Sequence, residues 1–319
     1  QVLVDREAGQ YLGHVTTVLL EDNRTMIAVY PKGHGRGSIV MKRSHDGGKT
    51  WSERLPVPAN WSTSQEVPTI HRVIDRQGVK RLILFSGLYP IRMAVSEDDG
   101  KQWTPLKKIG DFGGIVTMGC LTRLKNGDYL ALFHDDGRFL KKGGRPGKFF
   151  VYQTLSKDGG LSWSAPRVIA DHPQAHLCEP GIIRSPDGQQ LAVLLRENSR
   201  RLNSFLILSN DEGKTWTKPK NIGLRGKTPA GVTATLPGPG AGIVLQRGKY
   251  AGRFVAPINY GVAGTTAPGV AYSDDRGETW KVGGMCRAGV LMVEARGVEL
   301  LDGSLMFNAR TVNKKRGVT

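Results

Sequence analysis

Cysteine is scarce in this chain, and long apolar runs are absent. The 319 residues include three cysteines, Cys120, Cys178 and Cys286, far apart and odd in number. Their spacing fits no metal or redox motif, so we interpret them as buried thiols and expect no metal and no cofactor. No run of eighteen apolar residues occurs, which predicts no transmembrane helix and no membrane partner. The chain opens on Gln1 without a signal peptide, so we expect a mature, trimmed or partial chain.

Acidic residues are also few. There are 28 of them against 45 lysines and arginines, a formal net charge of +17, which predicts attraction to anions. The basic residues are spread out and no recognised nucleic-acid module occurs, so nucleic acid is not the expected partner. Clusters of basic residues do occur within residues 138–148 and 314–316. They have two interpretations, solvated loop charge or an electrostatic funnel for an acidic sugar.

Turn-forming residues, in contrast, are abundant. The chain has 42 glycines and 17 prolines, and 39% of its residues are hydrophobic. This composition is typical of all-β chains, and one domain can have this length.

One short pattern, S-x-D-x-G-x-(T/S/Q)-W, occurs five times. The copies begin 52, 60, 53 and 64 residues apart, at Ser44, Ser96, Ser156, Ser209 and Ser273. A period of this size predicts a repeat architecture with one supersecondary unit per repeat. Five of the six tryptophans lie in the copies; the exception is Trp61.

The residue types of the pattern predict a stapled hairpin. Aspartate accepts hydrogen bonds from nearby backbone N–H groups, glycine supplies a positive φ, and tryptophan buries a large ring. Alternating runs precede the copies at residues 38–42, 91–95, 149–155, 204–208 and 269–272. A further run lies upstream in each repeat, so each repeat is predicted to form about four antiparallel strands, one propeller blade.

The pattern resembles the Asp box, or bacterial neuraminidase repeat, of the sialidase superfamily. The resemblance implies that each box closes the turn between the two outer strands of a blade. The box aspartates are therefore expected to be structural and not catalytic.

The whole chain, residues 1–319, is accordingly predicted to be one six-bladed β-propeller domain of the sialidase type. The five complete blades are expected at about residues 11–55, 67–109, 118–169, 178–222 and 238–282. A sixth blade begins near Val293 and is incomplete at Thr319. Closure requires either an edge strand from residues 1–5 or further chain, and we expect a truncated or engineered end.

The segment 238–310 is the most family-specific part. Residues 238–245 and 253–257 are similar to the G-P-G-x-G-I-Q-L and R-L-V-V-P strands of sialidases, and residues 294–310 resemble their N-E-x-x-V-V-E-L-x-D-G-x-L-x-x-N-x-R element. The resemblance implies that Glu294 is a catalytic residue beside a tyrosine and that Arg310 clamps the substrate carboxylate. Guanidinium suits a carboxylate because it donates two parallel hydrogen bonds. The structural alternative is a salt bridge of Glu294 with Arg296 or Arg310.

A looser copy of this element lies in the fourth repeat. Glu179 stands on one expected strand and Arg196 at the end of the next. We include Glu179 as a candidate catalytic residue and Arg196 as a candidate substrate ligand, although repetition alone can produce such an echo.

The first repeat departs from the family. Leu12 stands where sialidases have the first arginine of their triad, and residues 32–38 lack the aspartate that serves as acid and base. His14, Lys32, His34 and Arg36 can form an anion site of different chemistry; the alternative is a polar turn.

Other polar groups near expected strand ends complete the candidates. Arg92 and Tyr260 are candidate substrate ligands, and the alternative role of Tyr260 is packing. Asp135 and Asp136, beside His134, can serve as acid and base, although paired aspartates are also frequent in turns.

The sequence therefore predicts a secreted or periplasmic, monomeric, exo-α-sialidase-like glycoside hydrolase. Its partner would be a glycan that carries sialic acid or another acidic sugar. The alternative is a non-catalytic carbohydrate-binding propeller or an inactive fragment of a sialidase. Because of the departures in the first repeat, and because the resemblance implies that the third arginine and the nucleophilic tyrosine would lie beyond Thr319, we expect slow turnover or none.

Overall fold

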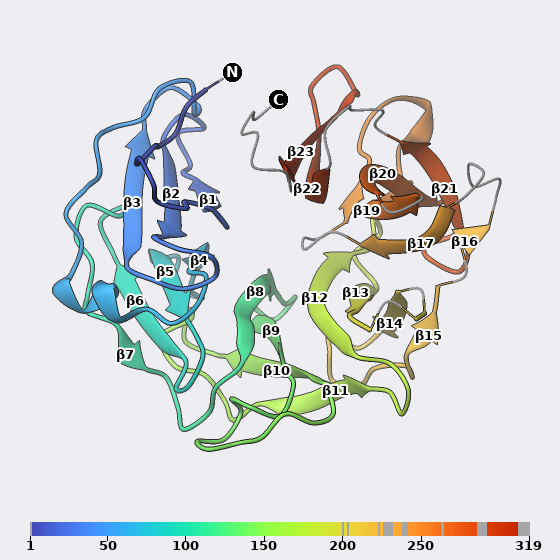
Figure 1. Cartoon of the computed structure of the whole chain (residues 1–319), viewed down its shortest axis with the longest axis horizontal. Helices are drawn as coiled ribbons and strands as arrows, with labels where there is room; N and C mark the ends of the chain where they lie inside the picture. Colours follow the sequence, from blue (N-terminus) through green and yellow to red (C-terminus); the bar gives the residue numbers. More distant parts are fainter. Residues whose placement is uncertain are drawn as a thin grey trace. The chain divides into compact units, whose positions relative to one another are not determined.

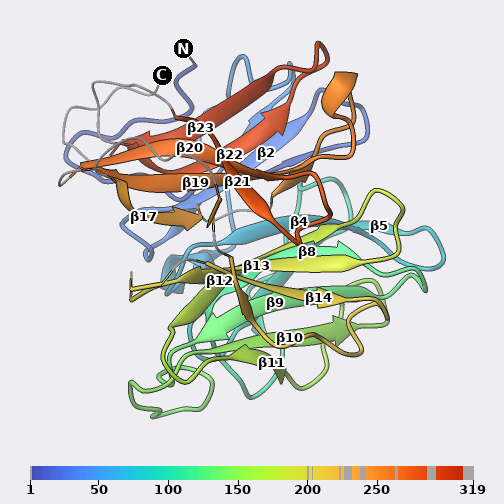
Figure 2. The same ribbon diagram turned by 90° about the vertical axis from the view of Figure 1, so that its right-hand side faces the viewer.

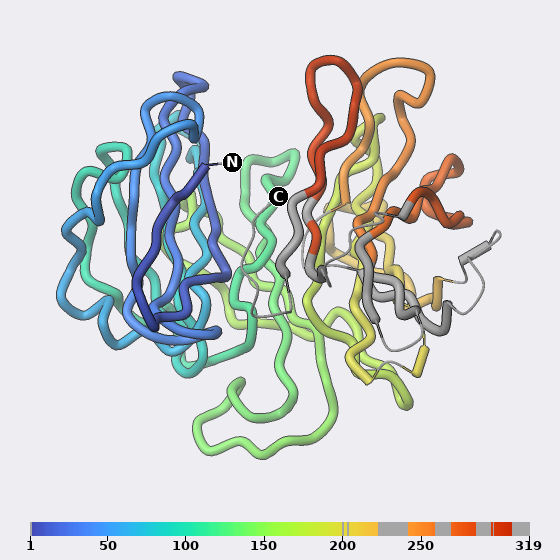
Figure 3. The backbone as a smooth tube through the Cα atoms, turned by 45° about the horizontal axis from the view of Figure 1, so that its top comes forward, coloured from blue at the N-terminus to red at the C-terminus, as the bar shows by residue number. Residues whose placement is uncertain are grey.

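The computed structural model describes residues 2–199, 201–202, 204–222, 224–225, 232–237, 242–262, 265–285 and 292–311. These residues are almost entirely β-structure, and their two 3₁₀ helices are short: η1 (Ala59–Thr63) and η2 (Gly248–Tyr250). The all-β prediction is confirmed. Residues 1–147 and 153–167 form one compact unit, called unit 1, and residues 148–152 and 168–319 form unit 2. Figure 1 labels the strands, and Figure 3 follows the backbone by residue number.

The first three sheets are antiparallel meanders. The first sheet contains β1 (Thr16–Leu19), β2 (Met26–Pro31) and β3 (Ile39–Ser44). The second contains β4 (Thr69–Ile74), β5 (Lys80–Ser86), β6 (Arg92–Ser96) and β7 (Lys107–Lys108). The third contains β8 (Ile115–Arg123), β9 (Tyr129–Asp135), β10 (Phe150–Ser156) and β11 (Arg167–Asp171), and the boundary between the units passes through it.

Unit 2 continues the pattern with three sheets (Figure 2). The fourth contains β12 (Leu177–Arg184), β13 (Leu191–Glu197), β14 (Phe205–Ser209) and β15 (Lys220–Asn221). The fifth contains β16 (Leu224–Arg225), β17 (Val232–Pro237), β18 (Ile243–Val244), β19 (Phe254–Val262), β20 (Thr265–Ser273) and β21 (Trp280–Met285). The sixth contains β22 (Met292–Glu299) and β23 (Leu305–Thr311).

The Asp boxes form the predicted turns. In the first, the Ser44 hydroxyl donates to Asp46 (2.8 Å) and accepts the N–H of Gly48 (2.8 Å), while Asp46 accepts the N–H of Thr50 (2.9 Å). The same three bonds recur in the other four boxes. The second to fifth boxes connect β6 to β7, β10 to β11, β14 to β15 and β20 to β21. The structural role expected for the box aspartates is confirmed.

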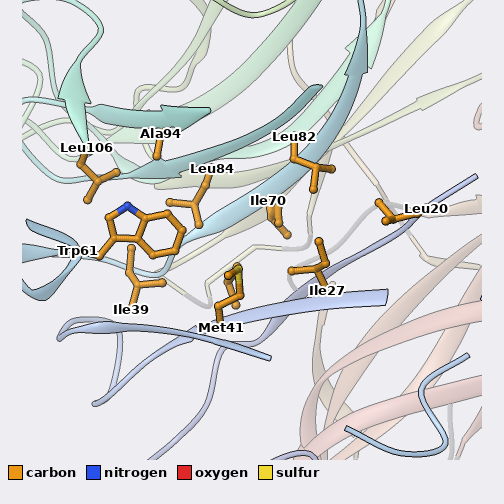
Figure 4. Packing of buried hydrophobic residues seen from close by; sticks show 11 residues of the cluster. Leu20, Ile27, Ile39, Met41, Trp61, Ile70, Leu82, Leu84, Ala94 and Leu106 are labelled. Atoms are coloured by element: carbon orange, nitrogen blue, oxygen red, sulfur yellow. The ribbon is translucent and has the colours of Figure 1, made fainter. Parts of the chain in front are cut away.

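The core lies between neighbouring sheets. In unit 1, side chains of the first two sheets surround Trp61, which is fully buried (Figure 4). In unit 2, the fourth and fifth sheets bury a second cluster that includes the box tryptophan Trp280. In these two pairs of sheets, one sheet therefore buries an apolar face against its neighbour, as repeat architectures require.

Two details differ from the four-strand expectation. Residues 52–55 bond to β3 through Ser52 N–H and Leu55 N–H but are not a regular strand, so the first sheet has three strands. In the fifth sheet, β16 pairs with β21 in parallel, because it comes from the segment that precedes the sheet's own meander. Cys120 and Cys178 are buried, as predicted, and Cys286 lies outside the described residues.

Candidate functional site

The start of β12 holds an acid–arginine pair. Cys178 is the register partner of Arg196, and the next partners are Gly181 and Leu194, so Glu179 belongs to a bulge of one extra residue. Glu179 has φ = 45°, an uncommon value for a residue other than glycine. The Arg196 guanidinium donates to the Glu179 carboxylate at 2.6 Å, with both side chains about four-fifths buried. The bulge thus aims the carboxylate at the arginine, a known use of bulges near functional sites.

The same register occurs in β22 and β23. Val293 is the partner of Arg310 and Arg296 that of Asn308, so Glu294 occupies the bulge position that Glu179 has in β12. The side chains of Glu294 and Arg310 lie outside the described residues. At the level of the backbone, the two acid–arginine pairs suggested by the sequence therefore stand at equivalent positions of two repeats.

The first strand of the third sheet, β8, has a larger bulge, and a residue outside the bulge stabilises it. Ile115 pairs with His134 and Cys120 with Leu132, so four residues oppose one. Val116 has φ = 49°, yet no acid stands there. Instead Glu66, which is buried, accepts the N–H of Val116 at 2.6 Å. Sequence reasoning missed Glu66, and no local pattern signals it because its partner is 50 residues away.

The first sheet gathers aromatic and basic groups where sialidases have an arginine and an aspartate. The His14 and His34 ring centroids are 4.8 Å apart, and the Tyr11 centroid lies 5.4 Å from that of His34. Lys32 is the bridge partner of Leu12 and forms an ion pair with Glu7 at 3.1 Å.

Glu7 is the acid that pairs with this cluster, through Lys32. Hydrogen bonds from Arg54 and Lys32 lower the pKa of Glu7. His14 has φ = 54° and lies between two regular pairings, Leu12 with Lys32 and Thr16 with Val29. Arg36 is exposed in the following loop.

Asp135 and Asp136 both organise the loop after β9. Asp135 is 1% exposed and accepts the N–H groups of Gly137, Phe139 and Leu140 at 3.0 to 3.1 Å. Asp136 forms an ion pair with Arg138, which raises the pKa of that guanidinium. These contacts are those of turn-forming acids, and a role as acid and base stays a prediction.

Glu197 is a second residue that sequence reasoning missed as a candidate. Its carboxylate is fully buried at the end of β13 and accepts the N–H groups of His176, Ser199 and Arg201. Burial opposes its charge, but these hydrogen bonds outweigh burial and lower the pKa of Glu197. Glu197 thus holds the backbone before Glu179, at His176, and the backbone after Arg196, at Ser199 and Arg201.

The remaining candidates are placed as follows. Arg92 donates to the hydroxyl and carbonyl of Thr63 at 2.7 and 2.6 Å, and burial lowers the pKa of its guanidinium. Tyr260 belongs to β19, and its side chain lies outside the described residues. Within the described ranges, no three His, Cys, Asp or Glu side chains come together as metal ligands, and no helix is long and apolar enough to span a membrane.

Curated relatives match parts of the chain. A sialidase of Micromonospora viridifaciens is 28% identical over 211 residues, 60% of this chain and 32% of that protein. A sialidase of Bacteroides fragilis is 36% identical over 107 residues, 33% of this chain and 18% of that protein. The matched part thus spans about a third or less of these relatives.

Solved structures share the fold over nearly the whole chain. The NanB sialidase of Streptococcus pneumoniae has a TM-score of 0.64 at 12% identity, covering 98% of this chain and 67% of its own. An α-L-arabinofuranosidase of Fusarium graminearum has a TM-score of 0.63 at 14% identity, covering 97% and 91%. The fold is therefore that of BNR-type glycoside hydrolases. A BNR repeat-like domain matches residues 88–231 and 143–319, and a BNR/Asp-box repeat matches residues 42–53. The chain belongs to the BNR repeat-like domain family, within the sialidase superfamily.

Proposed function

We propose that this chain is an exo-α-sialidase-like glycoside hydrolase for terminal sialic acid or a related acidic sugar. The observation that supports this best is the repeated register that sets an acid in a bulge beside an arginine, Glu179 with Arg196 and Glu294 with Arg310. We also propose that the six sheets close into one propeller and that the chain acts as a secreted or periplasmic monomer.

In this proposal the arginines bind the sugar carboxylate, since a guanidinium offers two parallel donors. A carboxylate nucleophile would be repelled by that anionic group, which is why sialidases depart from the two-carboxylate scheme and use tyrosine. Glu294 would act as the base that takes the proton of a tyrosine nucleophile, the residue type that sialidases use. The Glu179–Arg196 ion pair, at 2.6 Å, would keep the second guanidinium oriented before substrate binds.

The test is the release of free sialic acid from an aryl sialoside. Glu294→Gln should lower kcat by about 10² or more, because acid–base help contributes about 10²–10⁴-fold. Arg310→Met should raise KM for the sialoside far more than for a neutral analogue. Arg24→Met, which removes an exposed arginine, is the control and should change neither constant. Cleavage that survives both site changes would contradict the proposal.

A non-catalytic carbohydrate-binding role is the second candidate. It is favoured by the first sheet, where Tyr11, His14 and His34 stand in place of the family's arginine and aspartate. Saturable binding of a sialylated glycan without release of free sugar, lost in Arg310→Met, would support this alternative.

A further inference from the structure

The loop between β9 and β10, residues 136–149, is strongly basic. It contains a single acid, Asp136, and five cations: Arg138, Lys141, Lys142, Arg145 and Lys148. The loop follows β9 and leads into the beginning of β10, whereas the third Asp box follows the other end of β10 (Figure 2).

Hydrogen bonds connect parts of this loop at its base and tie its middle to a neighbouring segment. The Asp135 carboxylate accepts three N–H groups at the base, and Gly147 N–H donates to the Asp136 carbonyl at 2.8 Å. Gly113 N–H donates to the Leu140 carbonyl at 3.2 Å and ties the middle of the loop to the segment before β8.

The backbones of the two halves of the loop also lie in close contact. A Cβ on Gly144 would lie 2.4 Å from the Gly137 carbonyl oxygen, and one on Gly137, where φ is 94°, would lie 2.6 Å from the Arg145 carbonyl oxygen. Only glycine fits these contacts. A disordered loop of solvated basic residues would show neither this close contact between its two halves nor the hydrogen bonds.

The five cations divide into two groups. Arg138 pairs with Asp136 at 2.7 Å, and Lys148 pairs with Asp171. Lys141, Lys142 and Arg145 are exposed and form no ion pair among the described residues. This hydrogen-bonded loop thus presents three cations that form no ion pair with a carboxylate of the described residues.

We propose that Lys141, Lys142 and Arg145 form a docking surface for a carboxylated polysaccharide chain. The inference rests on the proposed function in one respect: the docked chain would be the glycan that carries the terminal acidic sugar. Lysine and arginine bind sulfate and carboxylate through charge-assisted hydrogen bonds. A pre-ordered surface loses little conformational entropy when it binds.

Nucleic acid fits this surface less well. Proteins that bind single strands add aromatic platforms for the bases, whereas Phe139 is half-buried with the Arg138 guanidinium 4.8 Å from its ring centre. Readout of a duplex needs a helix or a β-ribbon in the groove, and the loop contains neither.

The experiment compares two triple variants with the same loss of charge. Lys141→Gln/Lys142→Gln/Arg145→Gln removes the surface. Lys49→Gln/Lys101→Gln/Lys157→Gln is the control, because these lysines are exposed in Asp boxes. Binding to heparin, to polysialic acid and to duplex DNA is measured at several salt concentrations, after thermal unfolding has shown that both variants fold.

We expect the loop variant to bind polysialic acid about tenfold or more weakly, and its affinity to depend less on salt. The control should change by less than about twofold. Loss confined to polysialic acid would support carboxylate as the anion, whereas loss confined to heparin would indicate a sulfated occupant and contradict the inference. Glu294→Gln should retain polysaccharide binding, so failure of the catalytic proposal would not be confused with failure of this one.

Three further results would overturn the inference: equal losses in both triple variants, which would indicate diffuse electrostatics; no measurable binding of polysialic acid by the unmodified chain; or tighter binding of DNA that depends on the same three residues.

Discussion

At the scale of single residues, the box tryptophans differ although their sequence context is the same. Trp163 and Trp280 are buried, whereas Trp51, Trp103 and Trp216 are half-buried. The indole N–H donates to the box glycine carbonyl in Trp51, as it does in Trp163. Burial therefore depends on what the preceding repeat places over the ring, as Phe85 does for Trp163, and not on the box itself.

Trp163→Ala should lower the unfolding free energy by about 3–5 kcal/mol. Its ring is 8% exposed and meets the buried Phe85 ring edge-on at 5.5 Å. Trp51→Ala is the matched control and should cost clearly less, since Trp51 is half-buried. Urea unfolding measures the unfolding free energy of both variants. Equal losses would mean that the hydrogen bond from the indole to the box glycine, and not burial, stabilises the turn.

The box carboxylates predict acid sensitivity. Hydrogen bonds from Thr215 lower the pKa of Asp211 from 3.8 to about 2. A lowered folded-state pKa means that the contribution to stability is complete above about pH 4 and is lost as the pH falls through about 2. Asp211→Asn should lower Tm at pH 7 and flatten the fall of Tm in that window. An unchanged profile would show that this carboxylate does not contribute to the acid sensitivity.

At the scale of elements, bulges in the first strands of the sheets set the candidate site. Two of them present an acid, Glu179 or Glu294, and the one in β8 is fixed by Glu66. A bulge changes which face a side chain reaches, because strand side chains alternate.

Glu66→Gln should destabilise the chain by about 1–3 kcal/mol, since an amide group would face a backbone N–H of Val116 or Thr117. The neighbouring Gln65 is exposed, so Gln65→Glu is the control and should stay within about 0.5 kcal/mol. Thermal unfolding and hydrogen exchange at Val116 report the effect. Unchanged exchange there would refute the positioning role of Glu66.

At the scale of the whole molecule, the net charge of +17 should act on any anionic substrate. Between about 0.01 M and about 0.1 M salt, the screening length falls from about 30 Å to about 10 Å. KM for an anionic sugar should therefore rise over this range while kcat stays constant, and KM for a neutral analogue should not move. Steady-state kinetics in matched buffers test this, and equal salt effects on both substrates would exclude steering.

The sequence by itself determined what depends on short spacing. The serine, aspartate, glycine and tryptophan of a box lie within eight residues, so their hydrogen bonds are local, and the turns were predictable. The alternating runs predicted the strands for the same reason. The resemblance of residues 294–310 to one family element, and its echo at Glu179 and Arg196, predicted two pairs whose backbone positions are equivalent.

Tertiary structure alone decided the contacts between distant segments. The bond from Val116 to Glu66 and the clustering of Tyr11 with His34 depend on how one strand lies beside another, which no residue spacing encodes. It also made Asp135 the buried acceptor of three loop N–H groups. The physical reason is that a carboxylate taken out of water needs donors, and the folded chain determines which donors reach it.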